Sequence, residues 1–161
     1  MNALIEQHVA RALMRTSAAS ALLIGRDAPA LAQICEAQLS QLDVTVCERV
    51  CEYQSSRRFD AAFLVGALEE MEKPDGKALV ARLRDVDARY TCVAVPLSNI
   101  DSNGWSAADM LALGFKRVSN HGHHEQQAVI FDFSLHNYKA TPRWLNKDNW
   151  ANPEMWDKHR W

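Results

Sequence analysis

The chain has 161 residues, 48% of them hydrophobic, and 18 Lys and Arg against 20 Asp and Glu give a net charge of −2. This size and apolar content suit one folded domain and exclude a collagen, a coiled coil or a disordered tail. A net charge this close to zero creates no overall electrostatic attraction to nucleic acid or to an anionic membrane. We therefore expect neither as a partner.

The start of the chain carries no apolar run of the length that a membrane span requires. Glu6, Arg11 and Arg15 interrupt the first 25 residues, whereas a span needs roughly 20 apolar residues. The chain has four cysteines, Cys35, Cys47, Cys51 and Cys92. They show no CxxC spacing, which favours a reducing compartment and buried thiols over a metal or disulfide pair at Cys47 and Cys51. We expect a soluble, cytoplasmic protein without a signal peptide.

Helix and strand patterns alternate through the first half of the chain. Residues 3–15 place their apolar side chains on one helical stripe, which predicts an amphipathic helix. The short apolar run 21–24 ends at Gly25 and precedes a second helical pattern up to Leu39. β-Branched and apolar runs at 44–47 and 61–65 predict two more strands. The polar segment 49–58 between them is too short for another full helix and strand.

The second half continues the alternation and then changes it. After Pro74-Asp75-Gly76, helical spacing places four apolar residues on one face: Leu79, Val80, Leu83 and Val86. A strand follows at 91–95. Ser106 and Asp109 form an approximate capping box that predicts a helix over 106–113, which Gly114 ends. The last two strands, 115–118 and 128–133, have no helical pattern between them and should pair antiparallel.

These patterns predict one α/β domain over residues 1–135, followed by a tail over residues 136–161. We expect a three-layer Rossmann-like architecture, in which helices cover both faces of a mostly parallel sheet of about six strands. A C-terminal antiparallel strand pair completes that sheet.

The order of elements over residues 20–135 resembles the class I S-adenosylmethionine-dependent methyltransferases. The features that carry the resemblance are a glycine turn at 22–27 opening a helix, an acid directly after the second strand, the segment Phe59-Asp60-Ala-Ala-Phe-Leu-Val-Gly-Ala-Leu68 and the closing strand pair. The resemblance implies a cofactor crevice at the carboxyl ends of the strands, with Gly25, Asp27, Glu48 and Gly66 nearby. Glu48 would accept hydrogen bonds from the ribose hydroxyls. The alternative interpretation, which does not use the resemblance, is that Glu48 is a solvated loop carboxylate paired with Arg49 or Arg57.

The sequence also departs from this family. The family keeps three glycines at alternate positions after its first strand, so that the backbone approaches the cofactor closely. Here Gly25 takes the first position, but Asp27 and Pro29 take the second and third. No general base or acceptor pocket can be named, and the acidic stretch Glu69–Glu72 is interpreted as a solvated turn. We therefore expect a degenerate methyltransferase-like fold with no cofactor; the alternative is an enzyme that binds S-adenosylmethionine in a modified crevice.

Three histidines lie close together before the last strand. His121, His123 and His124 fall within four residues, and with Glu125 they are chemically sufficient for zinc or nickel if the turn folds back. A polar loop or a pH-sensitive surface patch is the alternative interpretation.

The tail holds four of the five tryptophans, Trp144, Trp150, Trp156 and Trp161. Each ring can bury roughly 150–250 Å², so we expect the tail to pack on its own domain, on a twin subunit or on another protein. Asn152-Pro153 predicts the start of one short helix. The sequence as a whole favours a noncatalytic interaction or regulatory protein over a small methyltransferase.

Overall fold

The structure is a computed structural model that describes residues 3–54, 57–96, 105–119, 128–135, 152–155 and 158. Its helices are α1 (Ala3–Thr16), α2 (Ala28–Gln38), α3 (Lys73–Arg82) and α5 (Ala107–Ala112). Its strands are β1 (Ser20–Ile24), β2 (Asp43–Cys47), β3 (Phe59–Val65), β4 (Ala88–Pro96), β5 (Lys116–Ser119) and β6 (Ala128–Ser134). Short 3-10 helices occupy Val50–Glu52, Leu68–Glu70 and Pro153–Met155.

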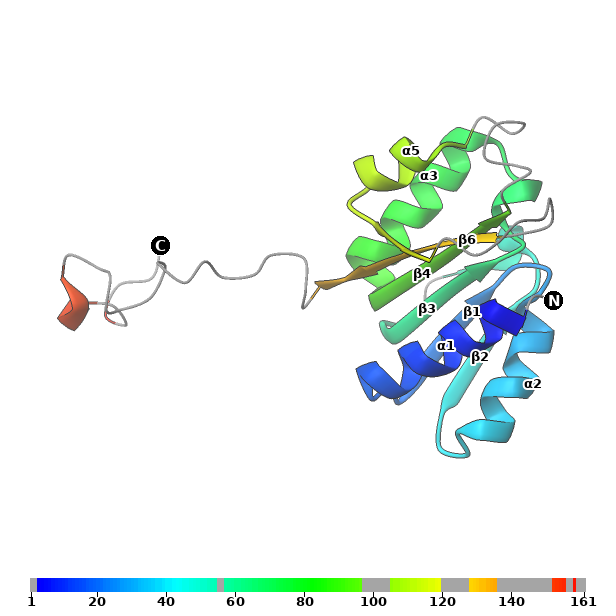
Figure 1. Cartoon of the computed structure of the whole chain (residues 1–161), viewed down its shortest axis with the longest axis horizontal. Coiled ribbons are helices and arrows are strands. Elements are labelled where there is room, and N and C mark those ends of the chain that lie inside the picture. The colour runs from blue at the N-terminus through cyan, green and yellow to red at the C-terminus, as the bar shows by residue number, and fades with distance from the viewer. Residues whose placement is uncertain are drawn as a thin grey trace.

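The six strands form one mixed sheet in the order β2-β1-β3-β4-β6-β5. Strands β1 to β4 pair in parallel, and β6 is antiparallel to both β4 and β5. Helices α1 and α2 cover one face of the sheet, and α3 and α5 cover the other (Figure 1). The structure therefore confirms the predicted three-layer α/β architecture, including the six strands and the C-terminal antiparallel pair.

The strand pleat divides the core into two apolar layers. In β1, Leu22 and Ile24 pack toward α3 and α5, whereas Ala21 and Leu23 pack toward α1 and α2. Successive strand side chains point to opposite faces, so a central strand covered by helices on both faces is apolar at every position. This burial explains why the run 21–24 has no polar alternation.

The buried face of α3 differs from the prediction at its C-terminal end. The α-helix ends at Arg82, and residues Leu83–Asp87 form a π-helical turn. Each π turn contains more residues than an α turn, so the 3.6-residue spacing no longer applies beyond Leu83. Leu83 is buried as predicted, but Val86 is 59% exposed and Asp87 is buried instead. The prediction that Val86 lies on the buried face was wrong.

Helix α5 begins and ends as the sequence predicts. The Ser106 Oγ accepts from the Asp109 N–H, and the Ser106 N–H donates to the Asp109 carboxylate, which completes a capping box. Gly114 takes a φ of +82° after the last turn. The Asp109 carboxylate also contacts the ammonium groups of Lys73 at 2.9 Å and Lys77 at 2.7 Å, both on α3. One carboxylate thus caps α5 and joins it to α3.

Candidate functional site

The turn between β1 and α2 packs tightly against the end of β3. Gly25 has a φ of +115°, which L side chains rarely adopt, and a Cβ at this position would lie 2.3 Å from the Val65 carbonyl oxygen. The Gly25 N–H donates to the Cys47 carbonyl at the end of β2. Only glycine fits here, because both the conformation and the space exclude a side chain.

Two further backbone hydrogen bonds close this turn onto β3. The Arg26 N–H donates to the Gly66 carbonyl at 3.3 Å, and the Asp27 N–H donates to the Val65 carbonyl at 3.4 Å. Gly66 has a φ of +69°, and a Cβ there would lie 3.0 Å from Asp27 Oδ2. The structure therefore brings Gly25, Asp27 and Gly66 together, where the resemblance expects a cofactor crevice.

Carboxylates gather beside this turn. Glu69 lies in the 3-10 helix that follows β3 and is partly buried. Burial raises the pKa of its carboxyl; Arg26 opposes the rise, and Asp27 and Glu70 add to it. An Arg26 guanidinium nitrogen lies 3.9 Å from a Glu70 carboxylate oxygen. Sequence reasoning missed Glu69, which it interpreted as part of a solvated turn; the available signal was its position three residues after a glycine that ends a buried strand.

Glu69→Gln is expected to stabilise the protein at pH 7.5. A carboxyl whose pKa is raised by folding contributes stability below its unfolded pKa and loses it as the pH rises through the folded pKa. The gain from Gln should therefore shrink between pH 7.5 and pH 4, as measured by urea unfolding at both values. The exposed Glu72→Gln is the control and should change stability by less than about 0.5 kcal/mol. Equal gains for Glu69→Gln at both pH values would contradict the assignment.

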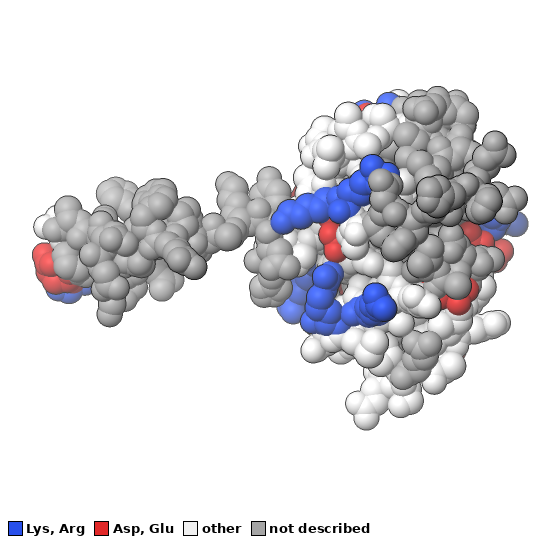
Figure 2. All heavy atoms as spheres, viewed as in Figure 1, with Lys and Arg blue, Asp and Glu red and all other residues white. Residues whose placement is uncertain are grey.

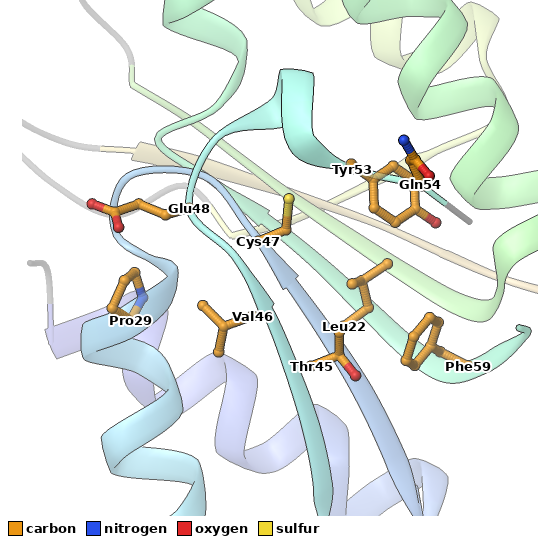
Figure 3. Close-up of a pocket in the computed structure, with 9 residues that line it drawn as sticks. All are labelled: Leu22, Pro29, Thr45, Val46, Cys47, Glu48, Tyr53, Gln54 and Phe59. Atoms are coloured by element: carbon orange, nitrogen blue, oxygen red, sulfur yellow. The ribbon is translucent and has the colours of Figure 1, made fainter. Parts of the chain in front are cut away.

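Glu48 lies directly after β2 and is exposed, as predicted. It lines a cavity of about 430 Å³ at the outer edge of the sheet, together with Leu22, Pro29, Thr45, Val46, Cys47, Tyr53, Gln54 and Phe59. In Figure 3, Glu48 and Pro29 lie at one end of this β2-edge cavity, and Tyr53, Gln54 and Phe59 lie at the other. Gly25 and Gly66 are not among the residues that line it, although the Gly25 N–H donates to the carbonyl of Cys47, the residue directly before Glu48.

The β2-edge cavity exists because the chain between β2 and β3 is short. In the order of the sheet β2 stands at the outer edge, and all five of its residues are at least partly exposed. The methyltransferases that the sequence resembles place a further helix and strand beyond this position, which residues 48–58 are too few to build. The space that those elements would fill is open.

Arg57 borders the β2-edge cavity. Its guanidinium lies 4.8 Å from the centre of the Phe59 ring, within 2.6 Å of an Asp43 carboxylate oxygen, and donates to Thr45 Oγ1 at 3.3 Å. The expected pairing of Glu48 with Arg57 is therefore wrong, because Arg57 contacts Asp43 instead.

Cysteine placement agrees with the sequence prediction in part. None of the four cysteines forms a disulfide, and Cys35 and Cys92 are buried. Burial raises the pKa of both thiols, so neither has the character of a reactive thiolate. Cys47, in contrast, is only partly buried and lines the β2-edge cavity, and Cys51 is exposed, so the prediction of a buried thiol was wrong for Cys51.

Two groups of predicted site residues lie outside the described residues. They are His121, His123 and His124, and Trp144, Trp150, Trp156 and Trp161. Within the described ranges, no group of three or more His, Cys, Asp or Glu side chains is suited to hold a metal ion. In the same ranges no helix is long and apolar enough to cross a membrane. The short helix predicted from Asn152-Pro153 through Trp156 and His159 begins as the 3-10 helix Pro153–Met155, and Trp156 and His159 lie outside the described residues.

The charged surface mixes both signs. Figure 2 shows Lys and Arg atoms beside Asp and Glu atoms on the face in view. Several of the basic side chains contact carboxylates directly: Arg15 with Asp132, Arg57 with Asp43, Lys73 and Lys77 with Asp109, and Arg82 with Asp87. Nucleic-acid surfaces instead present unneutralised cations to the phosphates.

The fold is similar to that of solved methyltransferases at low sequence identity. The methyltransferase domain of bacterial CtHen1 matches with 10% identity and a TM-score of 0.50, over 81% of this chain and 97% of that chain. An O-methyltransferase from Bacillus cereus, solved in complex with SAH, matches with 11% identity and a TM-score of 0.50, over 82% and 81%. A putative O-methyltransferase from Klebsiella pneumoniae matches with 14% identity and a TM-score of 0.51, over 83% and 81%. These likenesses show a methyltransferase-like Rossmann fold.

The sequence itself matches one described family over nearly its whole length. No curated protein matches it. The match covers residues 3–161, and the family is described as a family of unknown function, DUF6231. The chain belongs to this family, DUF6231.

Proposed function

We propose that this protein is a noncatalytic interaction or regulatory protein that uses a methyltransferase-like fold without binding S-adenosylmethionine in the crevice of that fold. The observation that carries the proposal is the closed turn between β1 and α2. Its backbone N–H groups at Gly25, Arg26 and Asp27 donate to carbonyls of β2 and of the end of β3. Donors used in this way are not available to a ligand.

The shape of the turn supports the same proposal. The Asp27 carboxylate packs against Gly66, and Pro29 stands in the first turn of α2. The side chains present therefore do not fit this cofactor.

A second candidate function is a small methyltransferase with a modified crevice. Glu48 favours it, because an exposed acid after the second strand borders a cavity of about 430 Å³, within the usual range for ligand pockets. This candidate requires the β1–α2 turn to open and Asp27 to leave Gly66.

The test is thermal unfolding with S-adenosylmethionine or S-adenosylhomocysteine at 1 mM. A ligand held with a Kd of 10 μM would stabilise the folded chain by about 2.7 kcal/mol and raise its Tm by about 5 °C or more. We expect no rise for the natural sequence. The double variant Asp27→Gly with Pro29→Gly, which restores the glycines that class I methyltransferases keep at these positions, is measured for comparison. A rise in the Tm of the natural sequence would favour the second candidate.

A further inference from the structure

The outer edge of β2 is one of the two strand edges that the described residues leave unpaired. Within the described residues β2 pairs only with β1, because it stands first in the order of the sheet. Val46, the fourth of its five residues, is 42% exposed. Exposed strand edges present unpaired backbone groups, and proteins normally cover them.

The β2-edge cavity is suited to flat apolar groups. Leu22 and Phe59 are almost fully buried and line it, and Tyr53 adds a second aromatic ring. Its volume of about 430 Å³ is large enough for an aromatic side chain and its flanking backbone. Glu48 at one end offers a carboxylate to a basic ligand. An extended, basic peptide segment with large rings has the matching chemistry.

The chain itself contains such a segment. Residues 136–161 hold four tryptophans, and five Lys and Arg against three Asp and Glu. The segment follows β6, which is separated from β2 by three strands.

We propose that residues 136–161 of one copy dock along the β2 edge of a second copy, with rings in the β2-edge cavity, so that two copies exchange arms. This inference rests on the proposed interaction function and names the partner as the same chain. Four rings of one arm bury roughly 600–1,000 Å², so two reciprocal arms reach the 1,200–2,000 Å² that is typical of a specific interface. In a two-fold exchange each copy supplies the same arm and the same docking edge, so the assembly closes as a dimer.

The test is the molar mass in solution of the full chain, by sedimentation over a concentration series. We expect a dimer. Val46→Lys should weaken it at least tenfold, because its charge would repel the basic arm at the docking edge. Val118→Lys is the matched control, because Val118 is 40% exposed on β5, at the opposite edge of the sheet, and this variant should leave the dimer unchanged. Trp144→Ala with Trp150→Ala, which leaves the described domain unaltered, should also weaken the dimer.

Thiol labelling identifies where the arm docks. Cys47 lines the cavity and should react slowly in the dimer, while the exposed Cys51 serves as the internal reference. Removing the two rings should speed Cys47 labelling at least tenfold relative to Cys51. A monomeric chain, a dimer insensitive to Val46→Lys, or a dimer broken by Val118→Lys would overturn the proposal. Protection of Cys47 in a monomer would place the arm on its own domain instead.

The two proposals fail separately. A chain that exchanges arms as described but binds S-adenosylhomocysteine would refute the noncatalytic function and leave the docking site standing. A monomer that binds no cofactor would refute the docking site and leave the noncatalytic function standing.

Discussion

Gly25→Ala is expected to destabilise the protein by about 3–5 kcal/mol, in the range of the largest single-substitution effects. Two costs add at this position. A φ of +115° is strained for any residue with a Cβ, and that Cβ would lie 2.3 Å from the Val65 carbonyl oxygen. Because the obstructing atom belongs to the backbone of a central strand, the clash is relieved only by moving the turn or β3. Urea unfolding monitored by circular dichroism measures the change.

Gly66→Ala is the matched control for this prediction. Gly66 also has a positive φ, +69°, but the nearest atom to its Cβ would be a terminal oxygen of Asp27, at 3.0 Å. A side-chain end can move, so we expect a cost of only about 1–2 kcal/mol. Equal costs for the two variants would contradict the closed turn described here.

Asp109→Ala is expected to cost about 3 kcal/mol. The substitution removes the capping box of α5 and leaves Lys73 and Lys77 without their shared carboxylate. A lost cap costs about 1 kcal/mol, and hydrogen bonds to charged groups contribute about 1.5–3 kcal/mol. Asp109→Asn should cost less than Asp109→Ala, because its side-chain oxygen still accepts from the Ser106 N–H.

The pH dependence separates the charge from the cap. The two lysines and Ser106 hold the pKa of the Asp109 carboxyl well below its usual range, with Lys77 the largest influence. Its contribution is therefore complete above the unfolded pKa of about 4 and is lost as the pH falls toward the folded pKa. The stability difference between the natural chain and the Asp109→Asn variant should shrink between pH 6 and pH 2. A difference independent of pH would show that the carboxylate charge contributes nothing.

The elements of the fold were predictable where one local signal decides the structure. Continuous apolar and β-branched runs place the strands, period-3.6 apolar patterns place the helices, and Ser106, Asp109 and Gly114 mark the ends of α5. The shortness of segment 48–58 predicts the missing helix and strand. Val86 was misplaced because helical periodicity assumes a constant pitch, and the change to a π turn at Leu83 has no clear signal in the residue types.

The candidate site was predictable in position but not in geometry. The meeting of Gly25 and Gly66 follows from parallel neighbouring strands, whose carboxyl ends share one edge. The partners of the turn's N–H groups depend on φ angles and on the spacing of β1 and β3, which no single residue encodes. The burial of Glu69 and the β2-edge cavity depend likewise on tertiary packing. The histidine cluster and the four C-terminal tryptophans remain predictions.

The most direct test of the noncatalytic account is calorimetric titration of the natural, full-length chain with S-adenosylhomocysteine up to 1 mM. The closed β1–α2 turn, whose N–H groups donate to β2 and to the end of β3, predicts no heat of binding. Saturable binding with a Kd in the micromolar range would contradict the account and would establish that the turn opens to admit the cofactor.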